Sequence, residues 1–271
     1  MLRTSIITLA VAAAAATLAP APSCTAFASP GTDALAASAK QSGFATWRDR
    51  TATVVTESHG EQGVTREREA AVSEMNDPDG GHRTLMEYDS PADVQGTMYL
   101  HVRPRSGEEQ EWIWTPAARK SRRIAPGGPD EQTSGAELSY RDLETMVRVL
   151  QWGEADADAT LLADETADGR TLQVIEITSK TNEFPYSKYR LKIGKDDLVP
   201  RGLEIIDAEG KPEAIVRIQE IETIDGHATP KRVEIVAPQT DRKSVLRLSD
   251  VRYDRDLPDT TFTLARLNRG R

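Results

Sequence analysis

Strict alternation of apolar and polar residues in two segments limits the kind of sheet that this chain can build. In residues 96–103, Met98 and Leu100 fall on one face of an extended strand and His101 falls on the other, and residues 186–193 alternate in the same way. Successive side chains of a strand point to opposite faces, so the pattern predicts one dry face and one wet face. Strands of a doubly wound parallel sheet would be apolar on both faces. We therefore predict an antiparallel sheet, with one face covered or curled around an interior.

Turn residues separate further extended segments along the rest of the chain. Clusters of Gly, Pro and Asp are typical of hairpin turns, and one of them is the DPDGG run at residues 77–81. These signals predict about nine to eleven strands. The other expected strands are residues 51–58, 65–75, 83–88, a segment that ends at 112–116, and residues 172–177, 201–207, 214–224, 231–237 and 243–253.

Two helices are expected beside these strands. Thr32 or Asp33 can cap a short helix that Gly43 ends. A second helix follows the capping-box spacing of residues 139–142. Its single apolar stripe consists of Leu143, Met146, Val147 and Leu150. The acidic residues 153–158 that come next are expected to form a solvated loop.

The first 28 residues have the three parts of a secretory signal peptide. Arg3 supplies the positive charge, residues 6–18 are apolar, and Ala26-Phe27-Ala28 is a small-x-small cleavage site. We therefore expect residues 1–28 to be removed and residues 29–271 to form a single exported domain, in the periplasm. Cys24 is the one cysteine of the chain. Lipidation of Cys24 is an alternative, although the residues before it make a poor lipobox; no disulfide framework is expected in either case.

Charge and side-chain chemistry exclude several classes of function. The formal net charge is −9, which argues against general binding of nucleic acid or of anionic lipid surfaces. Neither a nucleophile elbow nor a phosphate-binding or dinucleotide fingerprint occurs. None of the four histidines, His59, His82, His101 and His227, has a second histidine or a cysteine two to four residues away as a further metal ligand. We therefore expect neither an enzyme nor a protein with a metal or another cofactor.

A basic run stands out in this acidic chain. Residues 119–123 read Arg-Lys-Ser-Arg-Arg, and they follow Trp112 and Trp114 closely. The run is either a solvated strand or loop surface, or a docking patch for an acidic partner or lipid head groups. The two tryptophans are either ordinary core residues or part of a site for an amphiphile.

The segment that contains this run resembles a known family. Residues 112–124 (WIWTPAARKSRRI) are similar to the Trp-x-Tyr-x-Pro-Ala-x-Arg-x-x-Arg-Arg-Ile motif of outer-membrane lipoprotein-sorting proteins, the LolA-like superfamily. Residues 89–97 (DSPADVQGT) and 134–143 (SGAELSYRDL) resemble two further motifs of that group. Trp114 stands where the motif has Tyr, and the resemblance extends over about residues 47–267.

The resemblance implies a curved, half-open antiparallel β-barrel covered by short helices, whose apolar interior shelters acyl chains. On the alternation pattern we assign the cavity wall to seven residues, and we assign the lid to Met146 and Leu150 of the second helix. The wall residues are Leu85, Met98, Leu100, Trp112, Trp114, Tyr189 and Leu191.

The function implied by the resemblance is a periplasmic carrier. It would bind lipoprotein acyl chains or another lipid and pass this cargo to an envelope partner, for which an inner-membrane exporter of the resistance-nodulation-division type is a candidate. The alternative is an accessory module of such an exporter that has a filled core and carries no cargo. The residues expected to dock on the partner or on head groups are Arg119, Lys120, Arg122 and Arg123.

Overall fold

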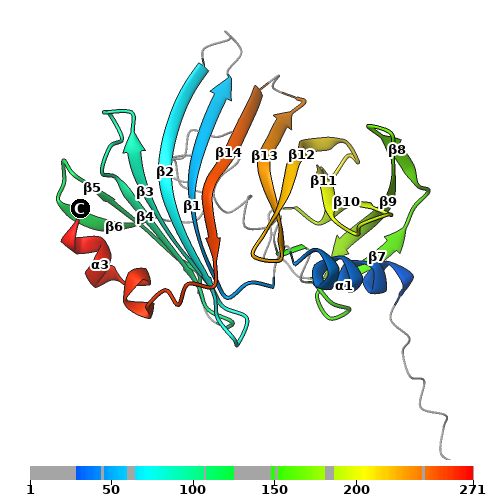
Figure 1. Cartoon of the computed structure of the whole chain (residues 1–271), viewed down its shortest axis with the longest axis horizontal. Helices are drawn as coiled ribbons and strands as arrows, with labels where there is room; N and C mark the ends of the chain where they lie inside the picture. Colours follow the sequence, from blue (N-terminus) through cyan, green and yellow to red (C-terminus); the bar gives the residue numbers. More distant parts are fainter. Residues whose placement is uncertain are drawn as a thin grey trace, which may run out of the picture.

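One large antiparallel sheet forms the body of the protein. The structure is a computed structural model, and it describes residues 29–43, 46–59, 65–106, 108–124, 148–149, 152–180, 186–239 and 242–270. This part of the chain builds a 14-stranded sheet in the order β6-β5-β4-β3-β2-β1-β14-β13-β12-β11-β10-β9-β7, with β8 paired to β9 (Figure 1). The sheet is curved and does not close, because β6 and β7 are its two ends. The predicted half-open antiparallel sheet is therefore confirmed.

The strands are β1 (Asp49–His59), β2 (Thr65–Asn76), β3 (His82–Ser90), β4 (Met98–Arg103), β5 (Gln110–Thr115), β6 (Lys120–Ile124), β7 (Ala157–Leu161), β8 (Glu165–Ala167), β9 (Arg170–Ser179), β10 (Lys188–Gly194), β11 (Pro200–Ile206), β12 (Pro212–Ile224), β13 (His227–Ala237) and β14 (Arg242–Tyr253). The expected number of strands was too low, because β6, β7 and β8 at the ends of the sheet have only three to five residues each, too few to show a clear alternation. In particular, β7 begins inside the acidic segment that was expected to be a loop. Ala157 and Ala159 of β7 are buried there.

The first helix, α1 (Pro30–Ser42), covers the β7 edge. Its N-cap is Ser29 and not Thr32 or Asp33 as predicted, because Pro30 is favoured at the first helical position and its ring fixes φ there. The Ser29 hydroxyl oxygen accepts a hydrogen bond from the Thr32 backbone N–H at 3.2 Å and donates one to the Ala159 carbonyl oxygen at 2.8 Å. Gly43 ends the helix in the left-handed conformation, with φ of 62°. The cap of α1 therefore also ties the helix to the backbone of an edge strand.

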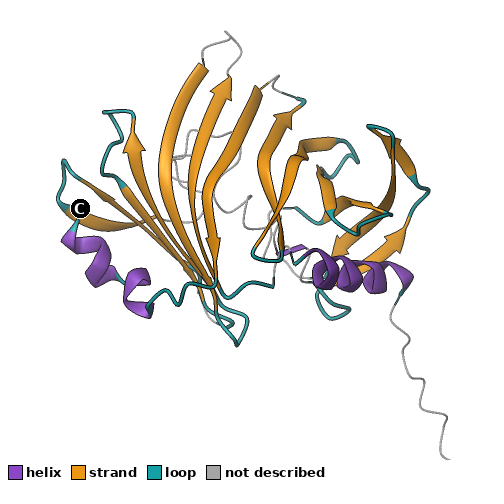
Figure 2. Ribbon diagram, viewed as in Figure 1, coloured by secondary structure: helices purple, strands orange, loops and turns teal. Residues whose placement is uncertain are grey.

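The C-terminal segment covers the opposite end of the sheet. It consists of a 3-10 turn, η1 (Asp259–Phe262), and a short helix, α3 (Leu264–Arg269). Asn268 accepts a hydrogen bond from the Ser121 backbone N–H at 3.2 Å, which satisfies a donor on the free edge of β6. Figure 2 shows the two helical segments beside the two ends of the sheet.

The cross-strand register divides the side chains between two faces of the sheet. Directly paired residues of an antiparallel sheet lie on the same face. We call the face that carries Tyr189 the α1 face, because Leu35 of α1 packs into its core cluster. We call the face that carries Met98 the α3 face, because Leu267 of α3 packs on it. Every described strand from β1 to β7 and from β9 to β14 contributes side chains to both faces.

Part of the predicted organisation falls on residues that are not described. The signal peptide, residues 1–28, lies outside the described residues, as do Cys24 and both lid residues, Met146 and Leu150. Of the predicted second helix, Arg148 and Val149 are described, and both have helical backbone.

Candidate functional site

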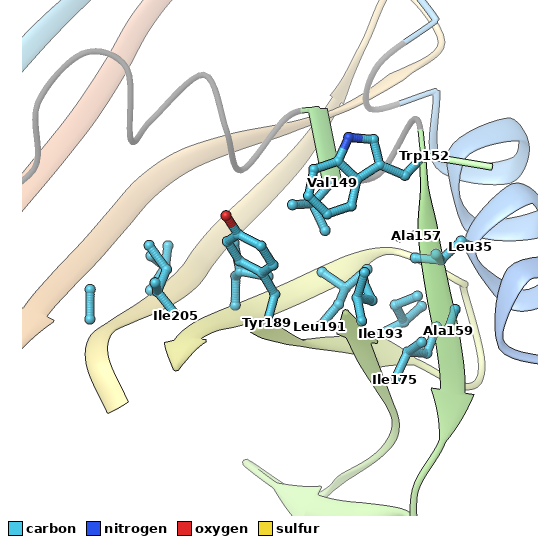
Figure 3. Packing of buried hydrophobic residues seen from close by; sticks show 14 of the residues in the cluster. Leu35, Val149, Trp152, Ala157, Ala159, Ile175, Tyr189, Leu191, Ile193 and Ile205 are labelled. Carbon is cyan, nitrogen blue, oxygen red and sulfur yellow. The ribbon is translucent and has the colours of Figure 1, made fainter. Parts of the chain in front are cut away.

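A large apolar cluster fills the α1 face from β7 to β12 and reaches Ile235 of β13 and Leu246 of β14. Tyr189, Leu191 and Ile193 of β10 are fully buried there. Val149 and Trp152 pack over them, and the Trp152 and Tyr189 rings meet edge to face with their centroids 5.5 Å apart (Figure 3). This end of the α1 face is therefore occupied by the protein's own side chains.

The middle of the α1 face keeps partial exposure. Val54, Leu248, Val233 and Ile218 are half-buried aliphatic residues from β1, β14, β13 and β12, and they pack against the edge of the large cluster. Val54 is paired with Leu248, and Val233 is paired with Ile218. We call these four residues the central apolar band. The band crosses four neighbouring strands without a charged side chain of its own, so it offers a row of accessible hydrocarbon.

The seven predicted wall residues lie on two different faces. Tyr189 and Leu191 lie on the α1 face. The other five lie on the α3 face, where Phe262 and Leu267 of the C-terminal segment cover them. These five are Leu85, Met98, Leu100, Trp112 and Trp114; Trp112 is half-buried and the others are buried. The seven residues therefore do not line one cavity.

The split arises because β4 is buried on both of its faces. His101 was expected on a wet face, yet it is buried, and so is Tyr99 on the same face of β4. Tyr99 lies on the α1 face with Ile113 and Ile124. Alternation identifies which residues share a face of one strand. Alternation does not show which face of one strand lies on the same side of the sheet as the apolar face of a distant strand, because that depends on the register of all the strands between them.

The α1 face also carries a buried polar cluster that sequence reasoning missed. Arg50 donates a hydrogen bond from Nε to Glu74 at 2.6 Å, and its guanidinium lies 4.9 Å from the Trp47 ring centroid. Burial alone would lower the pKa of Arg50, but the carboxylate of Glu74 and the hydroxyl oxygen of Tyr253 outweigh it and raise that pKa. His82 bonds through Nδ1 to the Asn76 side-chain oxygen at 2.9 Å.

The α3 face between β9 and β14 is charged. The Glu234 carboxylate forms ion pairs with Lys243, whose Nζ lies 2.6 Å away, and with Arg217 at 2.8 Å. The hydrogen bond from Lys243 is the first cause that lowers the pKa of Glu234 below its ordinary value, and Arg217 adds to it against the effect of burial. On β10 and β11, Lys192 and Glu204 form an ion pair at 2.7 Å. The wet side of the sheet is therefore the α3 face away from the C-terminal segment.

The four predicted docking cations lie at the β6 end of the sheet, and all are exposed. Arg119 ends the β5–β6 turn with φ of 48°. Arg122 is paired with Ile113 on the α1 face, whereas Arg123 is paired with Trp112 on the α3 face. Arg123 also forms an ion pair with Glu108 at 3.0 Å. The basic run therefore presents charge on both sides of an edge strand and does not make a patch on one face.

None of the helices in the described ranges combines the length and the apolarity that crossing a membrane requires.

A protein-family model whose description reads "Uncharacterized protein" matches residues 80–269, which is more than half of the chain. The chain belongs to this family. No curated protein matches the sequence.

Solved structures share the fold over most of the chain. An outer membrane lipoprotein-sorting protein domain from Vibrio parahaemolyticus is 21% identical with a TM-score of 0.75, over 88% of this chain and 98% of that one. A DUF1329 family protein from Desulfovibrio piger is 24% identical with a TM-score of 0.76, over 88% and 99%. A LolA superfamily protein from Nitrosomonas europaea is 19% identical with a TM-score of 0.66, also over 88% and 99%. The fold is LolA-like, as the sequence motifs predicted.

Proposed function

We propose that the protein is a carrier that binds the acyl chains of a lipoprotein, or another lipid, on the central apolar band. The single observation that carries this proposal is the row of half-exposed aliphatic side chains, Val54, Leu248, Val233 and Ile218, in the middle of the α1 face. Interior side chains are normally packed closely and hidden from water. A row that stays accessible beside a large core fits an apolar ligand that enters and leaves.

Elementary energetics support this use of the band. Removing one methylene from water contributes about 0.8 kcal/mol, so an acyl chain of about fourteen methylenes would gain on the order of 10 kcal/mol if it were fully buried. The filled end of the α1 face limits how much of a chain can be covered. A carrier needs such a surface and an exit for the cargo, and it needs no catalytic group.

The fold supports the same proposal from a second direction. A protein with this fold is described as an outer membrane lipoprotein-sorting domain. We therefore propose that the predicted signal peptide directs this chain to the periplasm. We also propose that the chain delivers its cargo to an envelope partner there, for which an inner-membrane exporter of the resistance-nodulation-division type is a candidate.

Lipid analysis of the purified mature chain, residues 29–271, tests the proposal. Native mass spectrometry should show a bound species that organic extraction identifies as a lipid or an acylated peptide. A fluorescent fatty acid should then bind to the delipidated protein and be displaced by the extracted species. A folded protein that carries no lipid and does not bind the fluorescent fatty acid would contradict the proposal.

A second candidate function is favoured by the filled end of the α1 face. An accessory module without cargo would use the exposed cations Arg119, Lys120 and Arg122 at the β6 edge to hold an acidic partner surface. Reversing the charge of Arg119 and Arg122 to Glu should then abolish capture of the exporter and leave fatty-acid binding unchanged. Capture that survives the double charge reversal would remove this candidate.

A further inference from the structure

Three potential metal ligands meet under the β4–β5 hairpin. His101 of β4 is paired directly with Glu111 of β5 on the α1 face, and both side chains are buried. Glu109 lies just before β5, and its Oε2 is 3.8 Å from His101 Nε2. One ligand atom from each of the three residues lies within 4.8 Å of those of the other two. A small rotation of the side chains would bring them to one ion.

The surroundings of Glu109 fit a metal ligand in particular. Its Oε1 is 3.1 Å from Arg148 Nη1, while its other oxygen faces His101. Carboxylates that bind metal ions are commonly held by an outer group through the oxygen that does not bind the ion, which fixes their orientation. Arg148 can orient the Glu109 carboxylate in this way, and it connects the three ligands to the helical residues 148–149.

The charges of the cluster also favour a cation. Two carboxylates, those of Glu109 and Glu111, lie beside the His101 imidazole, and burial makes carboxylates costly unless positive charge lies close to them. A divalent ion would bind both carboxylates and the imidazole nitrogen at once. The mixture of one nitrogen and two oxygen ligands suits transition metals such as Zn²⁺ better than Ca²⁺ or Mg²⁺, which prefer oxygen ligands alone.

We propose that His101, Glu109 and Glu111 form a binding site for a divalent transition-metal ion of the Zn²⁺ class. The sequence did not predict such a site, because the two glutamates follow His101 by eight and ten residues, and antiparallel pairing brings them back beside it. With three protein ligands, a tetrahedral ion keeps one position for water or for an anionic group. The ion would fasten β4 and β5 to the segment that carries Arg148. This inference does not rest on the proposed lipid carriage.

Cobalt(II) is a suitable probe because its visible absorption reports coordination by the protein. The mature chain is first stripped with a chelator and then titrated with Co²⁺, with Zn²⁺ as the competitor. We expect one equivalent to bind, Zn²⁺ to displace the Co²⁺ spectrum, and the melting temperature to rise on Zn²⁺ addition. The variants His101→Gln and Glu111→Gln should each weaken binding by more than about tenfold.

A neighbouring histidine provides the matched control. His82 is a buried histidine on the adjacent strand β3 and on the same face, with side-chain partners Asn76 and Thr84. His82→Gln should bind Co²⁺ as the unchanged protein does. If His101→Gln fails to fold, Glu109→Gln replaces it, because Glu109 is half-buried. A folded protein that binds neither Co²⁺ nor Zn²⁺ would overturn the proposal, as would Glu109→Gln and Glu111→Gln proteins that bind Co²⁺ as tightly as the unchanged protein does.

Discussion

Replacing Leu267 with alanine should lower the free energy of unfolding by about 2–5 kcal/mol. The Leu267 side chain is 0% exposed, and it packs with Phe262 into the cluster that contains Met98 and Trp114. The loss has two parts, the transfer free energy of the removed methyl groups and the cost of the cavity that remains. The cluster lies between the sheet and a short terminal segment, which can shift to fill part of the cavity. The loss in the free energy of unfolding should therefore fall in the lower half of that range.

Urea unfolding followed by tryptophan fluorescence measures this loss, and the same helix supplies a control. Leu264 is 37% exposed, so Leu264→Ala should change the free energy of unfolding by no more than about 0.5 kcal/mol. Fatty-acid binding by the folded Leu267→Ala protein should be unchanged, because the central apolar band lies on the other face of the sheet. Equal losses in the two variants would refute the reasoning that the C-terminal segment is anchored through Leu267.

Three further changes should have distinct effects. Glu74→Gln leaves the half-buried guanidinium of Arg50, whose side chain is 16% exposed, without its carboxylate partner, and urea unfolding should show that the free energy of unfolding falls by about 3 kcal/mol. The pKa of Glu234 is lowered from 4.5 by its lysine and arginine partners. The ionised carboxylate of Glu234 therefore contributes to the free energy of unfolding above pH 4.5, and this contribution is lost as the pH falls through the lower pKa of the folded state. Glu234→Gln should flatten the acid side of the stability–pH curve. Gly31→Ala would place a Cβ 2.4 Å from a β7 carbonyl oxygen, so hydrogen exchange in α1 should accelerate, whereas Gly153→Ala, with no atom nearer than 3.9 Å, should not change it.

The antiparallel sheet could be predicted from the sequence because its signal is local. Alternation over a single strand, such as residues 186–193, is sufficient to show that neighbouring residues have different surroundings. The helix that Gly43 ends was also predictable, although it begins earlier than the expected caps Thr32 and Asp33, because Pro30 takes its first position. The motifs in residues 112–124 are sufficient to indicate the LolA-like fold.

The site could be predicted only in part, because it depends on contacts between distant segments. Met98 and Leu100 form an apolar face of β4, but α3, about 165 residues later in the chain, covers that face. Tyr99 and His101 look like residues of a wet face in the sequence, and they are buried on the α1 face. The central apolar band combines single residues from four strands, so no segment of the sequence contains its pattern.

The measurement that tests the proposed carriage most directly compares two valines of β13. Val233 belongs to the central apolar band, whereas Val236, three residues later on the same strand, lies on the α3 face opposite Lys243 and is also half-buried. Binding of a fluorescent fatty acid should weaken by more than about tenfold in Val233→Asp, because a carboxylate in the band cannot be covered by hydrocarbon without loss of its hydration. The Val236→Asp protein should bind it like the unchanged protein. Equal affinity in the two folded variants would contradict the claim that the band holds the acyl chain.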